Sequence, residues 1–144
     1  MGVFTRFKRG AEGFRALVEL WETTASSRRA RMIEIGMSED PEFTQRALEC
    51  LMTFEDIRGL PDEELAEVMA KAPPRITAFA LHDADPSDRD RFIRCAMLRV
   101  GAEIRDCLEI EIGPRETEAA KLKLVATARE LERKGLVRIK RIPT

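Results

Sequence analysis

Hydrophobic residues recur along the chain with a helical period. Phe14, Leu17, Val18 and Trp21 stand at positions i, i+3, i+4 and i+7, a spacing that places them on one face of a helix. Alternation typical of a strand is absent until LVRIKRI (136–142), where a short extended segment is predicted. The pattern predicts helices near 12–23, 27–36, 41–52, 54–58, 61–71, 74–82, 86–97, 99–111 and 116–134. The predicted fold class is all-α.

Several residues predict where these helices begin and end. Asp40-Pro41 and Asp85-Pro86 each place a capping carboxylate before a proline at the first helical position, where a missing N–H costs nothing. Helix ends are predicted at the glycines that come after the periodic segments. These are Gly36, Gly59, Gly113 and Gly135.

The two Asp-Pro helices resemble each other. In register, DPEFTQRALECLM (40–52) and DPSDRDRFIRCAM (85–97) share Asp-Pro, an Arg, a Cys and a Met at an offset of 45 residues. This offset falls within the roughly 40–47 residue period of armadillo-like repeats, although two capping signals can also coincide by chance. A repeat predicts stacked helical units in which the shared Cys and Met are buried. The predicted core comprises Trp21, Ile33, Phe43, Leu48, Cys50, Leu65, Phe79, Phe92, Ile93 and Ile104.

Composition narrows the class of protein. A length of 144 residues predicts a single helical domain over 12–144. It is preceded by a basic flexible arm over 1–11. The alternative is two subunits, an armadillo-like one over 12–59 and a C-terminal helical subdomain over 60–144. Lys plus Arg number 25 against 26 Asp plus Glu, so the net charge of −1 argues against a nucleic-acid partner. No apolar run is long enough for a signal peptide or a membrane span. A cytoplasmic location is expected.

Catalytic chemistry is poorly represented. The chain has a single histidine, His82, no tyrosine, and no recognisable phosphate-binding or nucleophile motif. Cys50, Cys95 and Cys107 lack C-x-x-C spacing and are predicted to be free thiols. We therefore expect no enzyme, cofactor, bound metal or small-molecule substrate.

The helix predicted near 99–111 carries charge along one side. Arg99, Glu103 and Asp106 recur at i, i+4 and i+7, while Val100 and Ile104 occupy the other face. One interpretation is an ordinary amphipathic helix with intrahelical ion pairs, each contributing roughly 0.2–0.5 kcal/mol. The other is a binding ridge for a helix of complementary charge, in which charge sets orientation and encounter rate. Spacing alone leaves both open.

Four motifs in order resemble one family. They are EDPE at Glu39–Glu42, FEDI at Phe54–Ile57, the Gly113-Pro114 turn, and L-E-x-x-G-x-V-x-I at Leu131–Ile139. Over about residues 10–140 the chain resembles the C-terminal part of the FliG flagellar motor switch family. The resemblance implies an armadillo-like right-handed superhelix and a non-enzymatic role in motility and chemotaxis. The 144 residues correspond to that part alone, as expected of either a short paralogue or a fragment.

The resemblance also implies a partner and a site. In that family a charged ridge faces the cytoplasmic loop of the membrane stator. Arg99 and Asp106 take the positions of its arginine and first acid, while the second acid falls on Cys107. His82 replaces a family lysine, Arg115 follows the Gly-Pro turn, and the candidate site comprises Arg99, Glu103, Asp106, His82 and Arg115.

The expected partners come from the same resemblance. They are the stator loop and switch-complex proteins, with self-association through helix faces as a further expectation. The expected location is the cytoplasmic face of the inner membrane, in the flagellar basal body. The alternative is a helical-repeat adaptor that mediates protein–protein interactions outside the motor.

Overall fold

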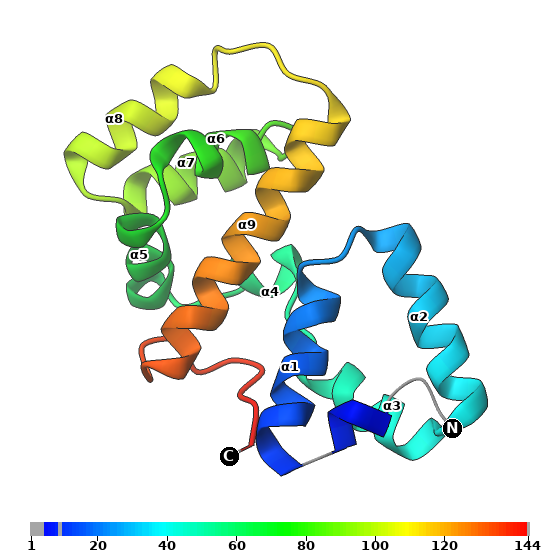
Figure 1. Ribbon diagram of the computed structural model, residues 1–144. Coiled ribbons are helices and arrows are strands. Elements are labelled where there is room, and N and C mark those ends of the chain that lie inside the picture. Colours follow the sequence, from blue (N-terminus) through cyan, green and yellow to red (C-terminus); the bar gives the residue numbers. More distant parts are fainter. Residues whose placement is uncertain (1–4, 9, 144) are drawn as a thin grey trace. The chain divides into compact units, whose positions relative to one another are not determined.

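The computed structural model describes residues 5–8 and 10–143, and within them the fold is helical throughout (Figure 1). The elements are the 3-10 helix η1 (Thr5–Lys8) and the helices α1 (Gly10–Glu22), α2 (Ser26–Glu39), α3 (Pro41–Cys50), α4 (Phe54–Arg58), α5 (Asp62–Lys71), α6 (Pro74–Ala80), α7 (Pro86–Cys95), α8 (Leu98–Cys107) and α9 (Pro114–Arg133). Each predicted helix is present, and the described residues contain no strand. The all-α prediction is confirmed.

By contact density the chain forms two compact units, Met1–Met52 with Lys140–Thr144 (unit 1) and Thr53–Ile139 (unit 2). The single domain predicted for residues 12–144, and its alternative division into 12–59 and 60–144, stay predictions.

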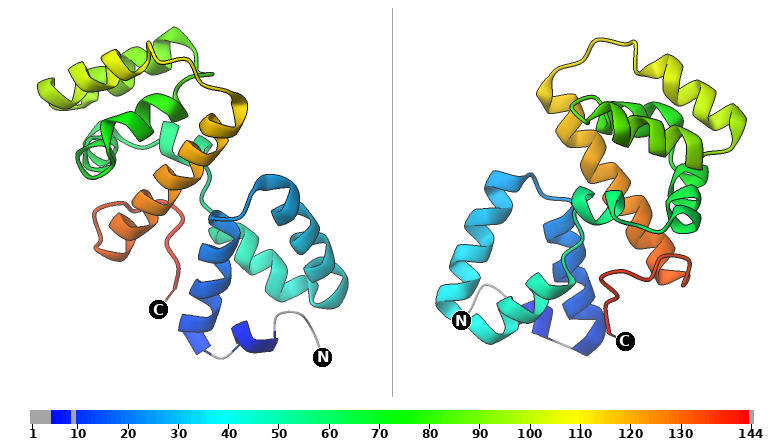
Figure 2. Two further views of the ribbon diagram at one scale, coloured as in Figure 1. Left: turned by 45° about the horizontal axis from the view of Figure 1, so that its top comes forward. Right: turned by 180° about the vertical axis from the view of Figure 1, so that it is seen from behind.

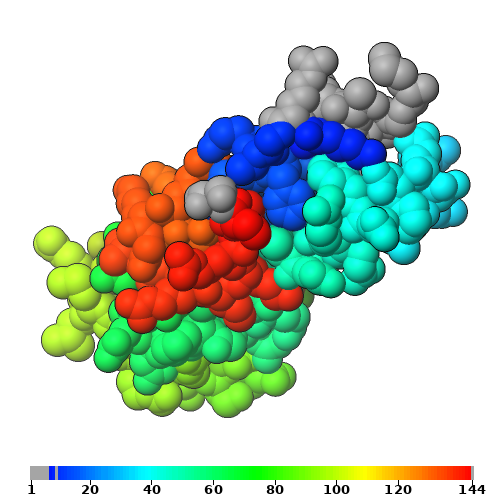
Figure 3. All heavy atoms as spheres, turned by 90° about the horizontal axis from the view of Figure 1, so that it is seen from below, coloured from blue at the N-terminus to red at the C-terminus, as the bar shows by residue number. Residues whose placement is uncertain are grey.

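Unit 1 is built on α1, which packs against η1 and α3, while α2 packs against α3. The chain returns to this unit near its end, where the buried Arg15 guanidinium of α1 donates to the Ile142 carbonyl at 3.4 Å. Figure 3 shows these last residues beside α1. The core of unit 1 comprises Phe7, Leu17, Val18, Trp21, Phe43, Ala47 and Ile142.

Part of the arm expected over residues 1–11 lies outside the described residues, namely 1–4 and 9. Thr5–Lys8 form η1, in which Phe7 is buried and the Lys8 ammonium pairs with the Asp40 carboxylate. This pairing, together with the hydrogen bond from the Phe43 N–H, lowers the pKa of Asp40.

Unit 2 is organised around the long helix α9, which packs against α4, α5 and α6. Its buried face includes Leu124, Ala128 and Leu131. Helix α6 also contacts α8, and α7 contacts both α5 and α8, so α8 lies on the far side of α6 from α9 (Figures 1 and 2). One face of α8 is therefore left uncovered within the unit.

Arg91 fixes α7 against the segment that joins α4 to α5. Its guanidinium donates to the carbonyls of Arg58 at 2.8 Å and Leu60 at 2.6 Å, and to the Asp62 carboxylate at 2.9 Å. The hydrogen bond from Arg91, with a second from Cys95, lowers the pKa of the Asp62 carboxyl group. Burial, with the neighbouring Asp62 carboxylate, raises the pKa of the Cys95 thiol, so this cysteine is held in the neutral form.

Helix ends agree with the sequence only in part. Asp40 caps α3 by accepting the Phe43 N–H at 3.2 Å, as predicted, and Gly135 follows α9 in the left-handed conformation at φ 79°. The predicted Asp85 cap is wrong, because its side chain makes no capping bond to α7. The predicted stop at Gly36 is also wrong, since this buried glycine lies inside α2, which continues to Glu39.

Two predictions near the C-terminal half need correction. Helix α8 ends at Cys107 and not near residue 111. The Gly113-Pro114 pair, predicted as a helix end, instead begins α9. The Glu116 carboxylate accepts the Gly113 N–H there and closes the first turn. The extended segment predicted over residues 136–142 is also wrong, since a turn at Ile139 and Lys140 interrupts it.

The predicted core is half correct. Trp21, Phe43, Leu65, Phe92 and Ile104 are buried as predicted. The remaining five are half-buried, because each lies at the border of its helix face: Ile33, Leu48, Cys50, Phe79 and Ile93. The three cysteines are free thiols as predicted, but all are half-buried, and Met97 of the second Asp-Pro segment is 72% exposed.

Candidate partner-binding surface on helix α8

Helix α8 is held on α6 and α7 by its apolar face, which buries Gly101 and Ile104 and half-buries Val100. At Gly101 the backbones of α7 and α8 approach closely. A Cβ atom there would lie 2.9 Å from the carbonyl oxygen of Ile93. Glycine at this position therefore lets α8 lie directly on α7.

The opposite face of α8 carries the charged ridge, defined as Arg99, Glu103 and Asp106. All three side chains are exposed. At 3.6 residues per turn their spacing places them within one narrow strip of the helix surface. The structure thus brings together the three ridge residues that the sequence predicted to share a face.

The charged side chains of the ridge form no ion pairs with the described residues. No residue of the described chain forms a hydrogen bond or ion pair with the side chains of Arg99, Glu103 or Asp106. The intrahelical ion pairs of the ordinary amphipathic interpretation are thus absent from this part of the structure. One cation and two anions stay available to a partner.

The other two candidates lie on different elements. His82 follows α6 and is half-buried, and its carbonyl accepts a hydrogen bond from the Arg89 guanidinium at 2.5 Å. Arg115 is exposed in the first turn of α9. Neither is joined to the charged ridge by a hydrogen bond or ion pair among the residues described.

Sequence reasoning missed the exposure of Met97 and Leu98, at the start of α8. Met97 is 72% and Leu98 is 95% exposed. Met97 occupies the N-cap position of α8 without forming a capping hydrogen bond. The signal available in the sequence was a pair of large apolar residues at a helix start that lacks Ser, Thr, Asp or Asn, the usual capping residues.

A second polar region of unit 2 holds its cations in ion pairs. A cavity of about 260 Å³ is lined by Phe54, Glu55, Arg58, Asp83, Ala84, Asp85, Asp88 and Lys121. Here Arg58 pairs with Asp88 at 2.6 Å, and Lys121 pairs with Asp83 at 2.9 Å. Both cations of the lining are therefore paired with acids, while its four acids outnumber its two cations.

Metal-binding clusters and membrane-spanning helices are absent from the described residues. Within residues 5–8 and 10–143, no cluster of three or more His, Cys, Asp or Glu could hold a metal ion. Nor does any helix in those ranges have the length and apolar character needed to cross a membrane. What α8 offers chemically is a rigid set of charges, suited to orienting a partner of complementary charge.

Known proteins share this architecture. Flagellar motor switch protein FliG of Aquifex aeolicus is 27% identical over 131 residues, covering 89% of this chain and 40% of the relative. The protein of the same name from Thermotoga maritima is 25% identical over 132 residues, covering 90% and 39%. The chain thus spans about two fifths of the length of these relatives.

Solved structures and family models agree with this similarity. A crystal structure of FliG residues 86–343 from H. pylori superposes with a TM-score of 0.64, covering 87% of this chain and 60% of that one. The two sequences are 19% identical, so this likeness shows the fold alone. The fold is the predicted armadillo-like one. The family model described as FliG C-terminal domain matches residues 36–139. The chain therefore belongs to the FliG C-terminal domain family.

Proposed function

We propose that the chain is a non-enzymatic component of the flagellar rotor, which meets the cytoplasmic loop of the stator through the charged ridge. The observation that carries the proposal is the exposed face of α8. Arg99, Glu103 and Asp106 project from a helix fixed on its other side, and the described residues leave all three without an ion-pair partner. A surface of this kind transmits force only if its helix is held, and Gly101 and Ile104 hold it.

The energetic scale fits a repeated, transient contact. An exposed ion pair contributes only about 0–1 kcal/mol. Complementary charge raises the rate of encounter and fixes orientation more than it adds affinity. Many weak contacts around a ring of rotor copies would allow each stator to engage and release quickly.

His82 and Arg115 belong to the proposal as flanking residues. Arg115 is exposed in the first turn of α9, and His82 is half-buried just after α6. We place this stator-facing surface in the switch complex, at the cytoplasmic face of the inner membrane. Self-association through helix faces is part of the same proposal.

The test is charge reversal in a strain whose motility depends on this protein. Arg99→Asp and Asp106→Arg are expected to impair rotation under load, while filament assembly and the circular dichroism spectrum of the purified variants stay unchanged. Reversing the opposing charge of the stator loop is expected to restore movement in part.

A matched control lies on the same helix. Arg105 is exposed but lies away from the ridge, so Arg105→Asp changes the net charge equally and is expected to leave rotation intact. If both ridge reversals swim like the parent under high load and no stator change alters the result, the proposal is wrong. An adaptor outside the motor would then be the better interpretation.

A further inference from the structure

The start of α8 carries an apolar knob, defined as Met97 and Leu98, whose side chains lie mostly in solvent. Leu98 is 95% exposed and Met97 is 72% exposed, whereas the other large exposed hydrophobics of the described residues lie between 37% and 44%. Met97 forms no capping bond at the N-cap position. Burial in the core therefore does not account for two large apolar residues at this position.

The knob is continuous with the charged ridge. Leu98, Ala102 and Asp106 succeed one another at intervals of four residues and form one row along α8. Ala102 is exposed as well, so this row presents apolar surface beside Arg99 and Glu103. A partner that lies along the ridge would meet the knob at the N-terminal end of α8.

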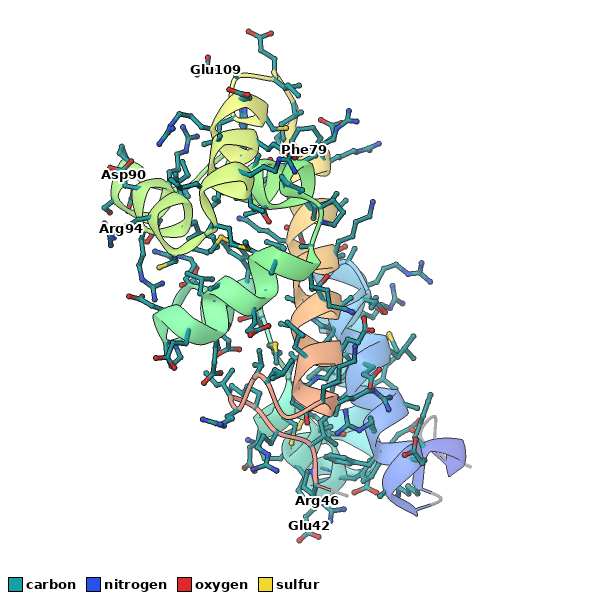
Figure 4. The ribbon with its side chains drawn as sticks, turned by 90° about the vertical axis from the view of Figure 1, so that its left-hand side faces the viewer. Glu42, Arg46, Phe79, Asp90, Arg94 and Glu109 are labelled. Carbon is teal, nitrogen blue, oxygen red and sulfur yellow. The ribbon has the colours of Figure 1, made fainter. Side chains whose placement is uncertain are left out.

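The two charged residues nearest to the knob along the chain are positive. Arg99 follows Leu98 on α8, and Arg94 lies three residues before Met97, exposed near the end of α7. Figure 4 labels Arg94 beside Asp90. The first turn of α8 contains no acidic residue to neutralise the positive end of the helix dipole. Charge complementarity thus favours an apolar recess bordered by carboxylates.

We infer that Met97 and Leu98 insert into an apolar recess, rimmed by acidic side chains, on the same stator loop that the charged ridge meets. The inference rests on the proposed function and adds a hydrophobic anchor to it. The anchor also offsets a charge missing from the ridge, since half-buried Cys107 stands where the resemblance places a second acid. The affinity for the stator then depends less on ionic strength than the affinity of a purely charged interface would.

The experiment measures the affinity of the full chain for the purified cytoplasmic loop of the stator subunit from the same organism, by calorimetry over a salt series. Burying a leucine side chain contributes enough that Leu98→Gln is expected to weaken binding by about tenfold or more. Its salt dependence should match that of the parent because no charge is lost. Arg99→Asp should weaken binding and flatten the salt dependence.

A matched control is Leu136→Gln, since Leu136 is an exposed leucine of unit 2 beyond the end of α9, at 44% exposure. This variant is expected to bind the loop like the parent. Both glutamine variants should unfold at the temperature of the parent, which separates a lost contact from a damaged fold.

The outcomes separate the two proposals. If the parent binds and Arg99→Asp weakens binding but Leu98→Gln does not, the knob inference is overturned and the proposed function stands. If the parent does not bind the loop, both are overturned. If Leu98→Gln abolishes self-association or binding to anionic phospholipid vesicles while leaving loop binding intact, the knob has a different occupant and the inference is wrong.

Discussion

The two Asp-Pro helices share a sequence pattern, but the methionine that follows each helix is buried in one case and exposed in the other. Helix α3 and helix α7 both run ten residues from proline to cysteine, and a methionine stands two residues beyond each. Met52 is fully buried, and its N–H donates to the buried Glu22 carboxylate at 2.8 Å. Met97 is 72% exposed and precedes the helix that bears the charged ridge.

The difference shows that a repeated sequence pattern specifies a helix but not the burial of each residue on it. Equivalent positions can hold side chains of very different size, since Phe92 of α7 corresponds to Ala47 of α3, and both are buried. Asp40 caps its helix, whereas the equivalent Asp85 does not. The segment after each helix decides whether the shared methionine joins a core or a surface.

The largest effect is expected from Phe92→Ala. Phe92 is 1% exposed and its ring lies 6.2 Å from that of Phe54, so truncation leaves a cavity in unit 2 and should cost about 3–5 kcal/mol of unfolding free energy. Urea denaturation monitored by circular dichroism measures this. Arg94→Ala, at an exposed position of the same helix, should stay within about 0.5 kcal/mol. Equal losses for the two variants would mean that α7 is not packed as described.

The two methionines test the comparison most directly. Met52→Ala should cost about 2–5 kcal/mol, because a fully buried side chain is removed. Met97→Ala should change the unfolding free energy by less than about 0.5 kcal/mol. Denaturation midpoints of the two variants, measured side by side, decide the matter. A loss at Met97 as large as that at Met52 would contradict the assignment of Met97 to the surface.

Gly101→Ala addresses how α8 rests on α7. The added methyl group would meet the Ile93 carbonyl at 2.9 Å, and the resulting shift of α8 should outweigh the gain in helix propensity, for a net loss of about 1–2 kcal/mol. The exposed neighbour Ala102→Gly should cost about 0.5–1 kcal/mol through propensity alone. Methyl NMR of Ile93 and Ile104 should report displacement only in the first variant. A stabilised Gly101→Ala protein would refute the close approach.

The smallest effect is expected at the helix caps. Asp40→Ala should lower the urea midpoint more than Asp85→Ala, because only Asp40 accepts a hydrogen bond from its helix. The pKa of Asp40 is lowered from 3.8 in the folded protein. Its stabilising effect is therefore present above the ordinary carboxyl pKa and is lost as pH falls through the lower folded value.

A pH series of the two aspartate variants checks the sign. The difference between them should be constant near neutral pH and shrink in acid. If the two midpoints coincide at pH 7, the cap at α3 contributes nothing to stability.

Helical periodicity and proline signals were enough to predict every α-helix of the described residues, though not the 3-10 helix η1. Burial of individual residues was harder, because the half-burial of Leu48 and Ile93 depends on how other helices pack on theirs, which one sequence window does not contain. The ridge at Arg99, Glu103 and Asp106 was predictable because its spacing is local. The knob was not, because exposure of Leu98 depends on which surface of α8 the helices α6 and α7 leave uncovered.

The return of the chain to unit 1 has a consequence for biosynthesis. Unit 2 is one continuous segment, Thr53–Ile139, whereas unit 1 needs residues made before it and after it. Two residues of unit 1, Arg141 and Ile142, are synthesised after all of unit 2. Ile142 is buried, and the Arg141 carbonyl oxygen lies 3.7 Å from the Cys50 sulfur. Unit 2 can therefore fold during translation. The core between α1 and α3 stays incomplete until Ile142 has been synthesised.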